Sequence, residues 1–337
     1  MRIALDAMGG DRGPEELVSG ALLAVRDTDV EVALVGDETV LRSVLRGKGV
    51  AEGPRLAVVH ASQIVEMSEN AVDAIRKKKD SSVLVACDLV ARGETAAVVS
   101  AGHSGATLAA AMRKLGRLEG VSRPGLASFF PTLKKPVVLM DIGGNVDCRP
   151  HHLLQFAIMA AAFSSIHQRE NPRIGLLTIG EEAGKGNALI RETYPLLAKS
   201  SLNFIGNIEG RDIFQGDVDV VVCDGFVGNV CLKISEGLAE AAMRMIGDEI
   251  RESLWTKLGY LLVKPAFRAF KKRVDYSEYG GAPILGIDGV GLVCHGKSDA
   301  VAIKNAILVA NKMVTGGVNE RIRREISGVP VSETDDE

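Results

Sequence analysis

One unit recurs along the chain: a short run of Val, Ile and Leu, a polar turn with glycine, and a helical pattern. Runs without polar alternation are typical of strands buried on both faces of a parallel sheet. The clearest runs are Ile3–Ala7, Val30–Val35, Ala96–Ser100, Val137–Ile142, Arg173–Ile179 and Val218–Cys223. The helical patterns are Pro14–Arg26, Ser104–Leu115, Pro150–His167, Asn229–Ile250 and Ser298–Val314. This alternation predicts an α/β fold with a mostly parallel sheet covered by helices.

Composition predicts one α/β domain over residues 1–325 and a flexible acidic tail over 326–337. Hydrophobic residues make up 46% of the chain, and the net charge of −3 gives no signature of nucleic-acid binding. The five cysteines lack Cys-x-x-Cys spacing, so we expect neither zinc nor a disulfide framework, and we expect reduced thiols in the cytoplasm. We expect no signal peptide and no membrane-spanning segment, because no apolar run reaches about 18 residues.

Five glycine-rich turns follow the predicted strands and carry the polar residues that chemistry requires. They begin at Asp6, Ser100, Asp141, Gly180 and Cys223. Ligands of parallel sheets gather at the carboxyl ends of the strands, so we expect these turns to converge on one crevice. Glycine lets peptide N–H groups approach an anion, and a helix that starts after the turn adds its positive end. A phosphate site is one interpretation; ordinary turns and helix caps are the other.

Two nucleotide-binding motifs are absent. The stretch Gly180–Gly186 has the wrong spacing for a P-loop, and Gly186 stands where a hydroxyl is needed. The first turn, Gly9–Gly13, does not fit the Gly-x-Gly-x-x-Gly fingerprint of dinucleotide-binding proteins. We therefore expect no ATP, no NAD, no metal and no other cofactor.

Several side chains in these turns could act on a substrate, and each has an ordinary alternative. Lys185 could hold a phosphate as a point charge, or it could pair with a neighbouring glutamate. His103 could polarise a carbonyl or cap the helix that follows it. Cys148 is a conceivable nucleophile, although a buried cysteine is the more common case. The aspartates after the strands are expected to orient the turns, because carboxylates repel phosphate at close range; they are Asp6, Asp11, Asp141 and Asp224.

The turns closely resemble those of the bacterial phosphate acyltransferases of phospholipid synthesis, the PlsX family. The matching stretches are 3–11, 100–106, 141–148, 180–182 with 185–186, 224–229, 279–283 with 285–286, and His295-Gly296. The resemblance covers nearly the whole chain except the acidic tail. The resemblance implies a Rossmann-like α/β/α sandwich related to phosphotransacetylases and isopropylmalate dehydrogenases. It also implies a homodimer at the inner face of the cell membrane, with Lys185 and Asn229 as the positions most closely tied to activity.

The reaction implied by this resemblance joins inorganic phosphate to an acyl group carried on acyl carrier protein. Lys185 would hold phosphate, and Asn229 at a helix start would donate to the developing oxyanion. The acyl phosphate would pass to a membrane glycerol-3-phosphate acyltransferase. The remaining residues expected to contact substrate are Gly9, Gly10, His103, Ser104, Gly105, Gly143, Asn145, Glu181, Asp224 and Gly225.

Residues 251–273 form an unusual segment with seven Lys and Arg residues and one acidic residue. Its apolar residues follow helical spacing, so it could lie on an anionic membrane, receive an acidic carrier protein, or pack in a dimer interface. The resemblance favours a protruding helix that touches the membrane. The residues expected to make that contact are Leu254, Trp255, Leu258, Leu261 and Leu262.

Three other functions stay open at this point. A phosphotransacetylase would use acyl-CoA in the same reaction. A decarboxylating dehydrogenase on a similar fold would need convergent aspartates and an arginine cluster, which the sequence lacks. A non-catalytic binder of the lipid carrier would release no thiol.

Overall fold

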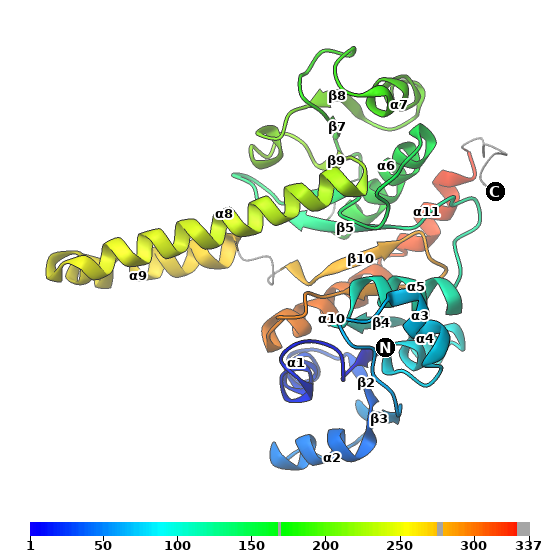
Figure 1. Cartoon of the computed structure of the whole chain (residues 1–337), viewed down its shortest axis with the longest axis vertical. Helices are drawn as coiled ribbons and strands as arrows, with labels where there is room; N and C mark the ends of the chain where they lie inside the picture. Colours follow the sequence, from blue (N-terminus) through cyan, green and yellow to red (C-terminus); the bar gives the residue numbers. More distant parts are fainter. Residues whose placement is uncertain (168–169, 275–278, 329–337) are drawn as a thin grey trace.

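One eleven-stranded sheet runs through the computed structural model, which describes residues 1–167, 170–274 and 279–328 (Figure 1). The strand order is β3-β2-β1-β4-β11-β10-β5-β6-β9-β7-β8. The strands are β1 (Arg2–Asp6), β2 (Glu31–Gly36), β3 (Leu56–His60), β4 (Ala97–Ser100), β5 (Gly125–Phe130), β6 (Val137–Met140), β7 (Ile174–Leu177), β8 (Phe204–Ile208), β9 (Val220–Val222), β10 (Ala282–Leu285) and β11 (Gly291–Val293). Most neighbouring strands are parallel, which confirms the predicted α/β class.

Helices cover both faces of the sheet and bury two separate cores. Successive residues of β1 show the division, since Ile3 and Leu5 belong to one core and Ala4 to the other. Helices α1, α6 and α10 pack on the first face, and α3, α4 and α5 pack on the second. The helices are α1 (Pro14–Asp27), α2 (Glu38–Gly47), α3 (Ala71–Lys77), α4 (Ser82–Ala91), α5 (Ser104–Lys114), α6 (Pro150–Ser164), α7 (Ala188–Lys199), α8 (Gly225–Glu252), α9 (Leu254–Val274), α10 (Ala300–Thr315) and α11 (Val318–Ile326).

The strand direction reverses in the middle of the sheet. Strand β10 is antiparallel to both β11 and β5, and β5 is antiparallel to β6. After these three reversals, β6, β9 and β7 run opposite to β1, β4 and β11. The carboxyl ends of the two strand sets therefore lie at opposite edges of the sheet.

Each strand predicted from the sequence is present, shifted by no more than about two residues at either end, the usual uncertainty of such boundaries. Strands β3, β5, β8, β10 and β11 were not predicted. Three of them supply the reversals, so the sequence pattern alone did not reveal that the sheet has two carboxyl edges.

Helix α8 begins four residues before its predicted start at Asn229, so that prediction is wrong. Asp224 caps the helix, because its Oδ1 accepts the Val227 N–H at 2.9 Å. Asn229 consequently lies on the second turn of α8. The helix ends at Glu252, and after Ser253 the chain continues as α9, which lies beside α8 as a hairpin protruding from the body (Figure 1).

Within the described ranges, no helix is both long and apolar enough to cross a membrane. The acidic tail expected over 326–337 lies outside the described residues from 329 onward. Its first residue, Ile326, closes α11 and is buried.

Candidate active site

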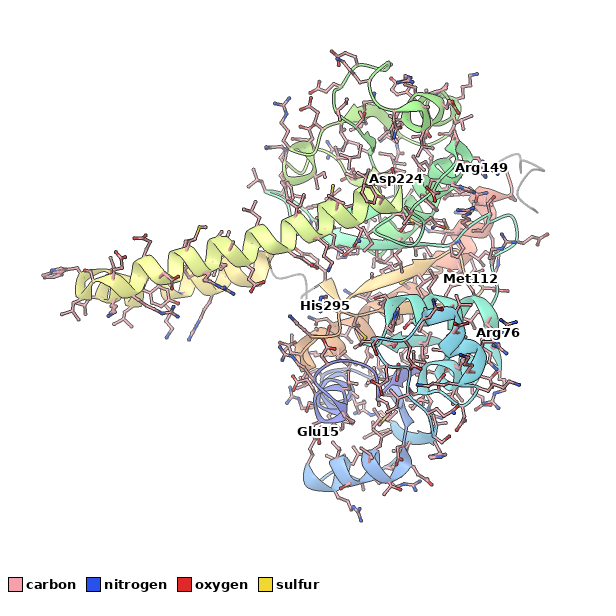
Figure 2. All side chains as sticks on the ribbon, in the orientation of Figure 1. Glu15, Arg76, Met112, Arg149, Asp224 and His295 are labelled. Carbon is pink, nitrogen blue, oxygen red and sulfur yellow. The ribbon has the colours of Figure 1, made fainter. Side chains whose placement is uncertain are left out.

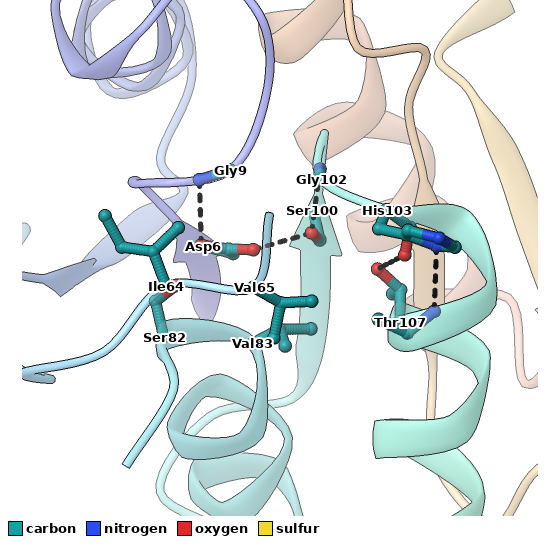
Figure 3. A pocket seen from close by; sticks show the side chains of 11 residues that line it. Asp6, Gly9, Ile64, Val65, Ser82, Val83, Ser100, Gly102, His103 and Thr107 are labelled. Carbon is teal, nitrogen blue, oxygen red and sulfur yellow. Dashed lines mark hydrogen bonds between the residues drawn. The ribbon is translucent and has the colours of Figure 1, made fainter. Parts of the chain in front are cut away.

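The first group of predicted site residues lies after β1 and β4 and comprises Gly9, Gly10, His103, Ser104 and Gly105; we call it the first loop group. Its centre is Asp6, which is 2% exposed. The Asp6 carboxylate accepts hydrogen bonds from the Ser100 hydroxyl at 2.7 Å and the Gly9 N–H at 3.2 Å (Figure 3). Asp6 therefore orients its turn, as predicted.

The cavity beside the first loop group is small. Figure 3 shows Asp6, Ser100 and His103 around it, together with Ile64 and Val65 from the loop before α3. Its volume is about 10 Å³, which is about enough for one water molecule. In this conformation it does not accommodate phosphate.

His103 is the N-cap of α5. Its Nδ1 atom accepts the Ala106 N–H at 3.3 Å, which leaves the ring proton on Nε2. The cap interpretation of His103 is therefore confirmed, and among the described residues no hydrogen bond engages its Nε2 atom. The N–H groups of Ser104 and Gly105 have no acceptor in the part of the chain that the structure describes, so the start of α5 can receive an anion.

The second group follows β6, β9 and β7 and comprises Gly143, Asn145, Glu181, Lys185, Asp224, Gly225 and Asn229; we call it the second loop group. Its centre is Asp141, which is fully buried. The Asp141 carboxylate accepts five N–H donors at 2.7–3.1 Å. The donors are the N–H groups of Leu126, Gly143, Gly144 and Asn145 and the Asn145 side-chain amide.

These bonds change how the glycine turns can be interpreted. The N–H groups of Gly143 and Asn145 are held by Asp141, and the Gly225 N–H donates to the Asn145 carbonyl at 2.8 Å. They are not available to an anion, so the expectation that these glycine turns cradle phosphate through their peptides is wrong for this loop. An anion at this site must therefore be bound by groups outside the turn 141–145.

Two side chains of the second loop group are suited to that task. Lys185 and Asn229 are both exposed and stand at the carboxyl ends of neighbouring strands, β7 and β9. Among the described residues, no ion pair engages the Lys185 ammonium, and no hydrogen bond engages the Asn229 amide. The nearby Glu181 pairs instead with Arg211 at 3.9 Å. The alternative of a glutamate-paired Lys185 is therefore not what the structure shows.

The prediction that all five turns converge on one crevice is wrong for a single chain. The turns after β1 and β4 and those after β6, β9 and β7 lie at opposite edges of the sheet because of the central reversals. In Figure 2, His295, which follows β11, and Asp224, which follows β9, lie apart. The predicted residues thus form two groups.

The cysteines near the second loop group are poorly suited to nucleophilic attack. Burial raises the pKa of Cys148 to about 12 and raises the pKa of Cys223 well above that of a free thiol. Both thiols are protonated at neutral pH, and the thiolate is the reactive form.

No cluster of potential metal ligands occurs in the described ranges.

Comparison with known proteins decides the family. A model of the fatty acid synthesis protein family matches residues 1–321. The phosphate acyltransferase of Geotalea uraniireducens is 56% identical over 97% of this chain and 94% of its own length. The chain belongs to the phosphate acyltransferase family. A second phosphate acyltransferase, from Geobacter sulfurreducens, is 54% identical with the same coverage. The protein is therefore an enzyme, an acyltransferase.

Solved structures show that the phosphate acyltransferase fold is shared more widely. A phosphotransacetylase from Streptococcus pyogenes superposes with a TM-score of 0.64 at 19% identity, covering 93% of this chain and 94% of that one. A 4-hydroxythreonine-4-phosphate dehydrogenase from Klebsiella pneumoniae gives 0.53 at 15% identity, covering 93% and 99%. At these identities the likeness concerns the fold alone, and it confirms the predicted fold, which this chain shares with phosphotransacetylases and dehydrogenases.

One surface was missed in the sequence. One side of α8 carries exposed apolar residues at every fourth position: Phe226, Val230, Ile234 and Leu238. We call these four residues the open stripe of α8. Their exposed fractions run from 40% to 67%, and Phe226 lies one turn before Asn229. The four-residue spacing was visible in the sequence and would have identified this stripe.

Proposed function

We propose that this acyltransferase moves a fatty acyl group from acyl carrier protein to inorganic phosphate at the second loop group. The observation that carries the proposal is the pair of exposed, unengaged side chains at the ends of adjacent strands: the Lys185 ammonium and the Asn229 amide. One is a cation for phosphate, and the other is a neutral donor for a carbonyl oxygen. The 52–56% identity with phosphate acyltransferases supports the same chemistry.

The proposed step is a direct displacement. An oxygen of hydrogen phosphate attacks the thioester carbonyl, the carbon–sulfur bond breaks, and the phosphate proton ends on the released thiol. Hydrogen phosphate is already anionic near neutral pH, so positioning and charge stabilisation matter more than a general base. Lys185 holds the phosphate, and Asn229 donates to the oxyanion as it forms.

The first loop group has a secondary role in this proposal. Because this group lies at the opposite edge of the sheet, the Nε2–H of His103 and the N–H groups of Ser104 and Gly105 would contact a polar part of the substrate remote from the reacting carbonyl. Since the cavity beside the group holds about one water molecule, we propose this contact at the surface of the group.

A thiol-release assay with palmitoyl carrier protein, run with and without phosphate, tests the proposal. We expect free thiol only when phosphate is present. Faster turnover with acetyl-CoA would instead indicate a phosphotransacetylase, and NAD reduction with 3-isopropylmalate would indicate a dehydrogenase. Carrier binding without thiol release would indicate a binding protein and contradict the proposal.

We also propose that the chain forms a homodimer through the open stripe of α8. A partner helix would cover Phe226, Val230, Ile234 and Leu238, which the described chain leaves exposed. Such a face is self-complementary when two copies pack about a twofold axis. Sedimentation of the wild-type protein should show a dimer. The double variant Ile234→Glu with Leu238→Glu should sediment as a monomer. Glu240→Lys, about 200° around the helix from Leu238, is the control and should leave the dimer intact.

The α8–α9 hairpin supports a proposed contact with the inner face of the membrane. All five residues expected to touch lipid are exposed, and Trp255 and Leu262 exceed 80%. A membrane contact would let acyl phosphate pass to a membrane-bound glycerol-3-phosphate acyltransferase. We expect Leu258→Glu with Leu261→Glu to abolish binding to anionic liposomes. Val301→Glu, a substitution at an exposed apolar position on α10, is the matched control. Equal liposome binding by the wild-type protein, the double variant and Val301→Glu would contradict the contact.

A further inference from the structure

The buried carboxylate of Asp141 organises more of the second loop group than any predicted site residue does. Its two oxygens take N–H donors from β5 and from the turn 141–145, at 2.7–3.1 Å. No hydrogen bond or ion pair to a cation reaches this carboxylate in the described ranges. Burial raises the pKa of Asp141, and the N–H donors oppose that shift. The hydrogen bonds of this carboxylate thus serve to hold the geometry of the turn.

The peptide of Asp141 also fixes the start of α8. A Cβ atom on Gly228 would lie 1.9 Å from the Asp141 carbonyl oxygen, so the helix backbone rests directly on this peptide. The Asp141 N–H donates to the Cys223 carbonyl at 3.0 Å, and the Cys223 N–H donates to the Met140 carbonyl at 2.9 Å. The residue therefore joins β6 to the strand that leads into α8.

The turn held by Asp141 reaches Asn229. Gly143 has a φ of +129°, a conformation that favours glycine, and a Cβ there would lie 3.5 Å from the Asn229 Cβ. The Asn145 carbonyl accepts the Gly225 N–H at 2.8 Å, which fixes the first turn of α8. Contacts thus run from the carboxylate through the turn 141–145 to both ends of the segment that carries Asn229.

We propose that Asp141 is a positioning residue of the acyl transfer, holding the turn 141–145 so that the Asn229 amide points to the forming oxyanion. The proposal rests on the proposed function, which places the oxyanion at Asn229. It predicts that loss of the carboxylate acts on turnover through Asn229. Small displacements of a catalytic group can lower rates by about 100-fold.

A double-mutant cycle between Asp141→Asn and Asn229→Ala tests the proposal, with kcat and KM measured for phosphate and acyl carrier protein. We expect Asp141→Asn to lower kcat about 10- to 100-fold and to change either KM by less than about 3-fold. In the Asn229→Ala background, Asp141→Asn should lower kcat by less than about 3-fold, because the group it positions is gone.

Asp219→Asn is the matched control. Asp219 lies at the opposite end of β9, and its carboxylate accepts the Arg173 N–H at 2.8 Å. We expect it to lower the melting temperature but to keep kcat within about 2-fold of wild type.

Two results would overturn the inference. One is an Asp141→Asn enzyme that is folded and keeps its kcat; the other is an equal loss of kcat with and without Asn229. If Asp141→Asn does not fold, Gly143→Ala replaces it in the same cycle, because it strains the same turn beside Asn229. Wild-type kcat in Asn229→Ala alone would instead contradict the proposed function, so the two failures are distinguishable.

Discussion

The two edges of the sheet use the same device with different results. At each edge a buried aspartate stands at the carboxyl end of a strand and accepts N–H groups from its own turn: Asp6, the last residue of β1, at the first edge and Asp141, directly after β6, at the second. At each edge a helix starts beside that turn, capped by His103 or by Asp224. The scaffolds therefore match, although they lie at opposite edges.

The difference lies in what each scaffold presents. The first loop group closes on a cavity of about 10 Å³, while the second presents an exposed lysine and an exposed amide. The peptide N–H groups of the turn 141–145 are used to build that turn, and the charge proposed to hold phosphate is that of the Lys185 side chain. A glycine-rich turn thus indicates a well-ordered scaffold, and the unengaged side chains beside it are the basis on which we propose the site of the reaction.

The substitution that we expect to lower kcat most is Asn229→Ala, at the second edge. Asn229→Ala removes the proposed oxyanion donor, and one such donor accounts for about 10²–10³ in kcat in other acyl transfers. We expect a loss of that size in the thiol-release assay, with KM for phosphate nearly unchanged. A loss of less than about 3-fold would place the oxyanion elsewhere.

The two buried aspartates should differ in their effect on stability. Asp141→Asn places an amide against five N–H donors, and we expect it to lower the free energy of unfolding by about 1–3 kcal/mol. Asp6→Asn should lower it less, because the Ser100 hydroxyl can reverse and accept from the new amide. Urea unfolding of both variants measures the difference. A larger loss in Asp6→Asn would contradict the comparison.

His103 should matter modestly at the first edge. His103→Ala removes the cap of α5, which costs about 1 kcal/mol of stability. We expect kcat to fall by less than about 10-fold, since a single neutral contact is lost. Thermal unfolding and steady-state kinetics of the same preparation check both values. A fall as large as that of Asn229→Ala would move the reaction to the first loop group.

The smallest effect is expected at Cys148. Since burial raises the pKa of this thiol to about 12, almost none of it is thiolate at pH 7.5. We expect Cys148→Ser to keep activity within about 2-fold of wild type. We expect the rate of alkylation of Cys148 by iodoacetamide to keep rising with pH beyond about pH 10, because the thiolate fraction is still increasing there. Rapid inactivation at pH 7.5 that Cys148→Ser abolishes would restore the cysteine nucleophile.

Much of the scaffold could be predicted from the sequence, because strands buried on both faces leave continuous apolar runs. The orienting role of the aspartates was also predictable, since a carboxylate beside glycine N–H groups favours bonding its own turn. The hydrogen bonds of Asp6, Asp141 and Asp224 confirm it.

The two edges could not be predicted, because strand direction depends on pairing partners that local patterns do not encode. Strands β10 and β11 have only four and three residues, too few for a clear periodicity, yet they take part in two of the three reversals. The start of α8 was missed because Gly225 and Gly228 resemble a turn. These two positions need glycine because other backbone lies against them. A Cβ on Gly225 would lie 2.5 Å from the Asn145 carbonyl oxygen, and a Cβ on Gly228 would lie 1.9 Å from the Asp141 carbonyl oxygen.

The most direct test of the account is the phosphate dependence of turnover in two lysine variants, one at each edge. Lys185 stands at the second edge, and the exposed Lys297 follows β11 at the first. Loss of a charged contact of about 1.5–3 kcal/mol predicts that Lys185→Ala raises the KM for phosphate about 10- to 100-fold, while Lys297→Ala leaves it within about 2-fold. A raised KM in Lys297→Ala with a normal KM in Lys185→Ala would show that phosphate binds at the other edge.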